Sequence, residues 1–330
     1  MSSSPGIVAQ MIVGRKPEQY LAAVLESIAG VCDHAIVNDN SGLDSSENAA
    51  VILASRLART GRLTLVRSSF ADFASARNAC LEATPSRFAH AWALFIDADE
   101  VHGDSLHAMA KLLPHLPSEI EAVDGYSRFF IGSFSWWRDL QRTRCFIRLS
   151  PQLRWSGKIH ERLSPVGRRI ALPAQWFQYG HVVLPREEAE KSFFYASLGA
   201  GCGPTREQLD LANAASVWAH LLGRAHRFEG RHPEAMAPII ERLAKERAQM
   251  FLAVDVLAGR RTLLDSVCNA VRLANTSRLL GWRALEAKVR WRWPADARYG
   301  VERPQDADAA PHGEASLDPE PAPQTARNSR

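Results

Sequence analysis

The amino-acid sequence predicts an α/β fold in which a mixed, mostly parallel sheet is flanked by helices. Three observations lead to this class: short apolar runs recur along the first hundred residues, segments with helical apolar spacing separate them, and turn-forming or acidic residues follow them. Strands that alternate with helices in this way are typical of βαβ units and parallel sheets. Ligands of such sheets bind beyond the carboxyl ends of the strands, so functional residues are expected there.

The elements of the N-terminal part follow a regular order. Strands are expected at 7–13, 34–38, 62–67 and 92–96, and helices at 18–29, 45–59 and 73–83. The first helix illustrates the pattern, because its apolar residues recur at the spacing that places them on one face. Three of the strand ends carry Gly14, Asp39 and Asp97, and chemistry is expected at these positions.

The pattern changes after residue 120. Extended segments are expected at 124–131, 144–149 and 169–184, and mainly helical ones at 187–200 and 205–293. From residue 294 the chain is rich in Pro, Ala, Asp and Glu and has few large apolar side chains, which predicts disorder. We therefore expect an α/β domain over 1–200, a helical extension over 201–293 and a disordered tail over 294–330.

Composition excludes several classes of protein. The net charge is +4 over 330 residues, and basic side chains alternate with acidic ones, which argues against a nucleic-acid partner. The five cysteines are widely spaced and form no Cys-x-x-Cys pair, so neither a disulfide framework nor a structural zinc site is expected. The chain has no pattern of a signal peptide and no apolar run of about 18 residues. A cytoplasmic location is expected.

Asp97 and Asp99 follow the fourth predicted strand and are separated by a single residue. Two carboxylates in this arrangement can reach one hard cation such as Mg²⁺ or Mn²⁺, which prefer oxygen ligands. The same side chains could instead cap a helix and favour its dipole. The segment also matches the nucleophile motif of haloacid-dehalogenase-like phosphatases, in which Asp97 would be phosphorylated. Three predicted strands precede the motif here, whereas in those phosphatases it closes the first strand.

Four motifs occur in a fixed order between residues 6 and 185. They are Asn-Asp-Asn-Ser at 38–41, Ala-Arg-Asn at 76–78, Asp-Ala-Asp-Glu at 97–100, and Arg-Leu-Ser-Pro at 148–151 followed by Trp-Ser-Gly-Lys-Ile-His-Glu at 155–161. In this order and spacing the sequence resembles the family 2 glycosyltransferases, whose catalytic domain has the Rossmann-like GT-A fold. The last motif is similar to a bacterial branch that includes lipopolysaccharide core glucosyltransferases, which work in cell-envelope polysaccharide biosynthesis.

The resemblance implies metal-assisted, inverting transfer of a hexosyl group from a nucleotide sugar, with UDP as the expected nucleotide. The implied acceptor is a saccharide, a lipid-linked molecule or a peptide. The residues that match the family motifs receive these roles: a catalytic base at Glu161; nucleotide contacts at Asp39, Ser41, Arg77 and Asp97; and ligands of Mg²⁺ or Mn²⁺ at Asp97, Asp99 and His181. A non-catalytic module that binds nucleotide on the same fold is the further alternative.

Glu161 carries the proposed chemistry. Inverting transfer needs a carboxylate that takes the proton of the acceptor hydroxyl, and partial burial by Trp155 and Ile159 would suit such a base. His160 could perform the same task. Alternatively, Glu161 binds the acceptor or pairs with Arg162.

The segment 278–293 combines arginines with a face formed by Trp282, Leu285, Val289 and Trp293. Basic amphipathic helices with tryptophan can lie in the bilayer interface, which predicts peripheral contact with the inner face of the cytoplasmic membrane. The alternative is packing against the chain's own domain or against a second subunit in a homodimer.

Overall fold

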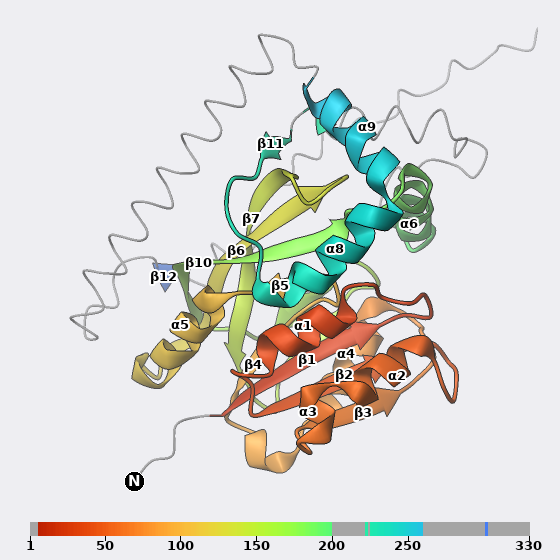
Figure 1. Ribbon diagram of the computed structural model, residues 1–330. Coiled ribbons are helices and arrows are strands. Elements are labelled where there is room, and N and C mark those ends of the chain that lie inside the picture. Colours follow the sequence, from red (N-terminus) through yellow and green to blue (C-terminus); the bar gives the residue numbers. More distant parts are fainter. Residues whose placement is uncertain (1–5, 200–221, 224, 260–300, 303–330) are drawn as a thin grey trace, which may run out of the picture.

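The computed structural model describes residues 6–199, 222–223, 225–259 and 301–302. It shows a central sheet with helices on both faces, as the sequence predicts (Figure 1). The amphipathic segment 278–293 lies outside the described residues. So does the predicted tail, apart from the two-residue strand β12 (Val301–Glu302), which pairs antiparallel with β10 (Arg168–His181).

The N-terminal part is a parallel α/β unit. Its elements are β1 (Ile7–Val13), α1 (Leu21–Ile28), β2 (His34–Asp39), α2 (Glu47–Ala54), α3 (Arg56–Arg59), β3 (Leu63–Arg67), α4 (Phe73–Glu82), the 3-10 turn η1 (Ser86–Phe88) and β4 (Trp92–Phe95). The four predicted strands are confirmed. The single helix predicted over 45–59 is divided in two, because Ser55 is extended and its Oγ caps α3 by accepting from the Ala58 N–H.

The remaining strands make the sheet mixed. These elements are β5 (Glu100–His102), α5 (Asp104–Leu112), the 3-10 turn η2 (Leu113–His115), β6 (Ile120–Ile131), β7 (Trp136–Arg148), β8 (Arg154–Ser156), β9 (Arg162–Ser164) and β10. The sheet order is β12-β10-β6-β7-β4-β1-β2-β3. The pairs β1–β2, β1–β4, β2–β3 and β6–β10 are parallel, whereas β7 runs antiparallel to both β4 and β6.

The side chains of β1 alternate between two apolar cores. Ala9, Met11 and Val13 pack on the side of α1, α2 and α3, whereas Val8 and Ile12 pack on the side of α4 (Figure 1). A strand that is covered on both faces reads as a continuous apolar run, which explains why the sequence pattern of β1 is so clear. The helices on the two faces hold β1 in place, and the functional residues lie at the ends of the strands of this sheet.

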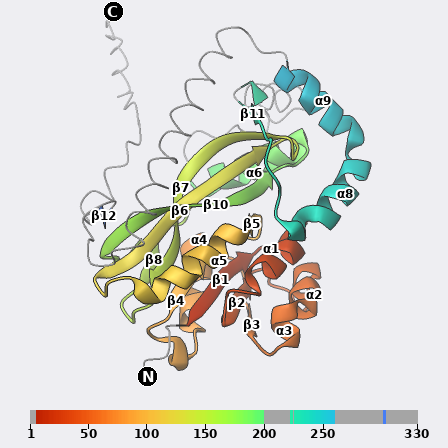
Figure 2. The same ribbon diagram turned by 60° about the vertical axis from the view of Figure 1, so that its left-hand side comes forward.

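The C-terminal helices wrap one side of the domain. They are α6 (Pro185–Ser197), α8 (Ala237–Glu246) and α9 (Ala248–Gly259). The short strand β11 (His226–Arg227) and the 3-10 turn η4 (Glu234–Met236) precede α8. Helices α8 and α9 form an arc that begins beside α1 (Figure 2). Arg247, between α8 and α9, donates to the Val182 carbonyl at 3.0 Å and to Gln19 at 3.2 Å. None of the described helices has the length and apolar character needed to cross a bilayer.

Candidate active site

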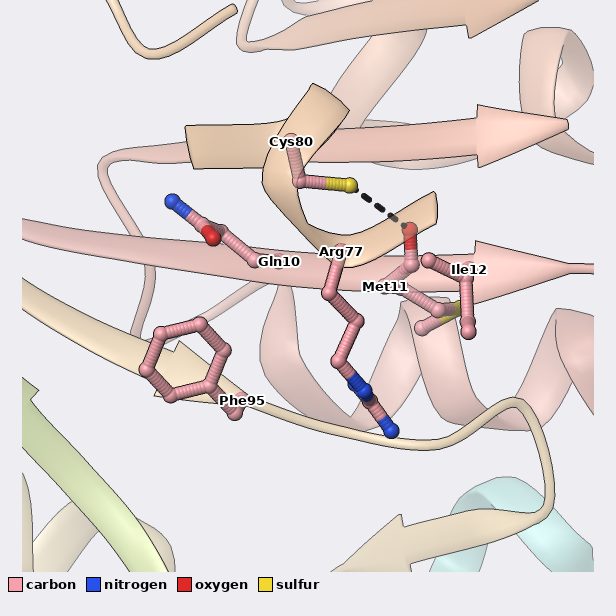
Figure 3. A pocket seen from close by; sticks show the side chains of 6 residues that line it. All are labelled: Gln10, Met11, Ile12, Arg77, Cys80 and Phe95. Carbon is pink, nitrogen blue, oxygen red and sulfur yellow. Dashed lines mark hydrogen bonds between the residues drawn. The ribbon is translucent and has the colours of Figure 1, made fainter. Parts of the chain in front are cut away.

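Arg77 joins two of the motifs that the sequence analysis singled out. The Asp72 carboxylate caps α4 by accepting from the Ser75 N–H at 2.7 Å, and this helix carries Arg77 toward the loop after β4 (Figure 3). Its Nε donates to Glu161 Oε1 at 2.5 Å, and its Nη2 donates to Asp97 Oδ1 at 2.6 Å. One guanidinium therefore binds a carboxylate from each of two motifs that are 64 residues apart.

The side chains of this bridge are partly shielded from solvent. The side chains of Arg77 and Glu161 are 12% and 13% exposed, whereas that of Asp97 is 51% exposed. The guanidinium carbon lies 5.1 Å from the ring centroid of Trp155, a distance at which cation–π attraction operates. Burial acts to lower the pKa of Arg77, but Asp97 and Glu161 outweigh it and raise that pKa. The guanidinium of Arg77 is therefore charged.

Asp99 lies next to the end of β10. Gln178 Nε2 donates to its Oδ2 at 3.0 Å, and Lys191 Nζ of α6 lies 3.9 Å from the same oxygen. A side chain on Gly180 would overlap this oxygen, so the backbone of β10 forms one wall of the carboxylate's pocket. Burial raises the pKa of Asp99, and its buried Oδ1 has no hydrogen-bond partner among the described residues.

The Asp99 Oδ1 atom is suited to bind a cation. Burying a carboxylate oxygen without a hydrogen-bond partner costs free energy, and a metal ion would supply the missing partner. The role of Asp97 and Asp99 as ligands of a divalent cation stays a prediction. His181 is held by Glu188, whose Oε1 lies 2.9 Å from Nδ1. Among the described residues, no three His, Cys, Asp or Glu side chains are grouped as a ready metal site. Further ligands would have to come from substrate phosphates, as Mg²⁺ sites commonly use.

Glu100 holds the acidic loop in place. Its Oε2 accepts from the Asp97 N–H at 3.0 Å, and its Oε1 accepts from the Trp176 indole N–H at 3.1 Å. Burial and the neighbouring Asp97 raise the pKa of Glu100 to about 8. Glu100 therefore connects the loop to β10 through the Asp97 backbone, while the Asp97 side chain contacts Arg77.

Asp39 and Ser41 lie at the end of β2, which is two strand spacings, about 10 Å, from β4. The Asp39 carboxylate is 1% exposed and accepts from the Ser41 N–H at 3.0 Å and from the Ser46 hydroxyl at 2.6 Å. Ser41 in turn accepts from the Leu43 N–H at 3.2 Å. The Asp39 carboxylate thus accepts hydrogen bonds from the turn that follows it, which is typical of Asp at such a position.

The structure thus brings Arg77, Asp97 and Glu161 into direct contact and places Asp99 beside the end of β10. Glu161 pairs with Arg77 rather than with Arg162. His160 is exposed and has a φ of 52°, in the left-handed region. The alternative of a base at His160 stays a prediction.

Sequence reasoning missed several residues of the site. Gln178 and Lys191 contact Asp99, and Glu188 holds His181. Glu18, in the loop that precedes α1, has a pKa raised to about 7 by burial and by Asp99. No local pattern marks Gln178, Lys191 or Glu188 as functional, since each reads as an ordinary strand or helix residue. Glu18 could have been noticed only from its place after the first strand.

Part of the chain matches a known protein family. Residues 12–170 match the model of glycosyl transferase family 2. No curated protein sequence matches the chain. Among solved structures, the chain is similar to the mannosyltransferase PcManGT from Pyrobaculum calidifontis in complex with GDP-Man and Mn²⁺, with 13% identity over 89% of each chain and a TM-score of 0.36. It is also similar to S. aureus TarS 1-349 in complex with UDP-GlcNAc, with 12% identity, 66% of this chain and 72% of that chain covered, and a TM-score of 0.37.

The matched segment contains four of the residues that form or flank the site: Arg77, Asp97, Asp99 and Glu161. It begins within β1 and ends within β10, so it covers the sheet from the first strand to the last long one. The haloacid-dehalogenase-like phosphatase alternative has no such support. Residues 12–170 therefore match glycosyl transferase family 2, the family that the sequence motifs resemble.

Proposed function

We propose that this protein transfers a hexosyl group from a nucleotide-sugar donor, with UDP as the nucleotide, to an acceptor hydroxyl in one displacement that inverts the anomeric carbon. The observation that carries the proposal is the bridge formed by Arg77 between Asp97 and Glu161. It joins the carboxylate expected at the donor with the carboxylate expected at the acceptor. A transferase needs both within reach of one reacting carbon.

Asp97 and Asp99 are proposed to hold Mg²⁺ or Mn²⁺. His181 is proposed as a third ligand that joins them only after a local movement, since no three such side chains are grouped among the described residues. Support comes from the partnerless oxygen of Asp99 and from the contact between His181 and Glu188. Metal-binding histidines commonly donate their other ring nitrogen to a carboxylate in this manner. When bound, the ion would neutralise the charge that develops on the departing diphosphate.

Glu161 is proposed as the base. Its carboxylate would take the proton of the acceptor hydroxyl while the hydroxyl oxygen bonds to the anomeric carbon. The bond between that carbon and the phosphate oxygen breaks at the same time, and its electron pair leaves with the nucleoside diphosphate. The product is a glycoside of inverted configuration, a nucleoside diphosphate and protonated Glu161, which then returns its proton to solvent.

Arg77 prepares this step. In the structure, its Nε donates to Glu161 Oε1, so the guanidinium occupies one oxygen of that carboxylate. A diphosphate is a strong competitor for a guanidinium because it offers bidentate, charge-assisted hydrogen bonds. Donor binding would thus draw Arg77 toward the phosphates and leave Glu161 free to accept a proton. This order links base activation to the presence of the donor.

Asp39 and Ser41 are proposed to face the nucleotide base. An ionised carboxylate only accepts hydrogen bonds, which suits the N3–H of uracil. Because Asp39 is buried and already bonded to Ser46, the turn after β2 must open for this contact. The nucleotide preference therefore depends on a local rearrangement.

Thermal-shift titration with UDP, GDP and CDP, each with Mn²⁺ or with EDTA, tests the proposal. A ligand that binds only the folded state stabilises it by about 2.7 kcal/mol at 100 times its dissociation constant, which raises the melting temperature measurably. The expected result is a shift with UDP that requires Mn²⁺. A shift with UDP without turnover on any acceptor, in the wild type and in Glu161→Gln alike, would favour a non-catalytic binding module. No shift with any nucleotide would refute the proposal.

A further inference from the structure

Four aromatic side chains form a surface cluster outside the carboxylates of the site. This aromatic patch consists of Phe70, Phe73, Phe194 and Tyr195. The ring centroids of Phe70 and Phe73 lie 5.2 Å apart, and Phe194 lies 5.9 Å from Phe70 and 6.5 Å from Phe73. The ring of Tyr195 lies 6.0 Å from Phe73. Phe194 is 43% exposed, so the patch presents an open aromatic face.

The patch is continuous with the candidate active site. On α4, Phe73 precedes Arg77 by four residues, and on α6, Tyr195 follows Lys191 by four. Residues four apart lie on the same face of a helix, so each helix carries a charged site residue and an aromatic ring one turn away. Lys191 Nζ lies 3.9 Å from Asp99 Oδ2 and 5.9 Å from the Tyr195 ring, which connects the two regions directly.

The patch also touches the segment of the proposed base. The Phe73 N–H donates to the Lys158 carbonyl at 3.2 Å, three residues before Glu161. Arg77, one turn after Phe73, then contacts Glu161 itself. A molecule that lies on the aromatic rings would therefore reach the side of the site from which Glu161 takes its proton.

The chemistry of this surface favours a sugar ring over a membrane. The face of an aromatic ring is electron-rich, and the C–H groups on one side of a pyranose carry partial positive charge, so the two stack favourably. The exposed ring of Phe194, supported by three half-buried rings and with carboxylates nearby, offers both the stacking face and the hydrogen-bond acceptors that a sugar uses. Helix α6 bears Glu187, Glu188 and Glu190 against Arg186 and Lys191, a net charge of −1. Anionic lipid surfaces attract basic segments and would not favour this helix.

We propose that the aromatic patch is the acceptor subsite, and that its occupant is a pyranose ring of a saccharide acceptor. The inference rests on the proposed glycosyltransferase function and adds the chemical class of the acceptor. Phe194 supplies the exposed stacking face, and the other rings hold it in position. The acceptor hydroxyl then points toward Glu161.

The test measures transfer to methyl glycosides of glucose, galactose, mannose and N-acetylglucosamine. The donor carries the nucleotide that gives the thermal shift. We compare Phe194→Ala, Phe194→Leu and Phe194→Trp with a matched control, Leu53→Ala, which removes an equally exposed apolar side chain (52% exposed) from α2. Because a stacked ring contributes about 1 kcal/mol, the acceptor KM should rise roughly fivefold in the alanine and leucine variants. Phe194→Trp should retain the wild-type KM, since it keeps an aromatic face.

Other outcomes overturn the inference. If Phe194→Leu matches the wild type while Phe194→Ala does not, the patch recognises an apolar chain and no sugar face. Binding of the wild type to vesicles of phosphatidylcholine and phosphatidylglycerol that is lost in Phe194→Ala would assign the patch to a lipid surface. A nucleotide-dependent thermal shift without transfer to any glycoside would refute the saccharide acceptor alone. No shift with any nucleotide would refute the proposed function as well.

Discussion

Arg77 Nε lies 2.5 Å from Glu161 Oε1, although 84 residues separate the two in the sequence. Both side chains are nearly buried, and the guanidinium also binds the more exposed Asp97. The contact connects the helix that follows β3 with the segment between β8 and β9. The contact therefore contributes both to the packing of the domain and to the arrangement of the site.

Arg77→Met should destabilise the protein. Methionine keeps the length of the side chain but leaves Glu161 buried without a partner, and loss of one member of a buried pair costs about 3 kcal/mol. Urea unfolding measures the effect. Arg56→Ala is the matched control, because its ion pair with Glu26 joins side chains that are 44% and 52% exposed. The control should lose less than about 1 kcal/mol. Equal losses in the two variants would contradict the structural importance of the bridge.

Gly180→Ala should abolish the pocket of Asp99. The added methyl group overlaps Asp99 Oδ2, so the carboxylate or β10 has to move. Displacing a metal ligand or its support commonly weakens metal binding 10- to 100-fold. Titration of Mn²⁺ in the presence of UDP measures this loss. Gly103→Ala is the control, because the nearest atom to its added methyl group is a Pro233 carbon at 3.9 Å, an ordinary contact. Unchanged Mn²⁺ affinity in Gly180→Ala would argue against Asp99 as a ligand.

Glu161→Gln should separate binding from turnover. Glutamine has nearly the same shape but cannot take a proton, so kcat should fall about 100- to 10,000-fold. The thermal shift with nucleotide and Mn²⁺ should remain, since the donor side of the site is intact. Asp99→Asn should instead lose the Mn²⁺-dependent thermal shift. A Glu161→Gln variant with wild-type kcat would exclude this residue as the base.

His232 should make stability depend on pH in the acidic range. Burial lowers the pKa of His232 to about 4, partly opposed by its hydrogen bond to the Phe134 carbonyl. The ring nitrogens lie 2.7 Å from the Tyr179 hydroxyl and 3.1 Å from the Phe134 carbonyl, an environment that suits neutral imidazole. The unfolded state, with a pKa of about 6.5, therefore binds more protons between pH 6.5 and 4. Stability from this group is complete above pH 6.5 and declines as the pH falls toward 4.

Urea unfolding between pH 7 and 4 measures this dependence. Its slope from one histidine reaches at most about 1.4 kcal/mol per pH unit. His232→Gln should reduce the slope in this window, and His115→Gln, on an exposed residue, should leave it unchanged. Identical slopes in the wild type and His232→Gln would show that His232 is not neutral in the folded protein.

The first half of the fold could be predicted because local signals agree there. The strand β1 is covered on both faces and shows an unbroken apolar run, and the helices around it keep their amphipathic spacing. The break at Ser55 was missed, because the apolar spacing continues across it and only the capping geometry reveals it. The antiparallel placement of β7 between β4 and β6 could not be read from the sequence, since strand order depends on long-range pairing.

The sequence by itself determined the resemblance to the family and which residues are candidates for the site, because the motifs at 38–41, 76–78, 97–100 and 155–161 keep their order and spacing. Only the tertiary structure decided which side chains meet. It showed that Arg77 binds Glu161, that Gln178 and Lys191 surround Asp99, and that rings from α4 and α6 form one patch. The physical reason is that local patterns specify helices and strands, whereas contacts between distant segments depend on how these elements pack into a common core.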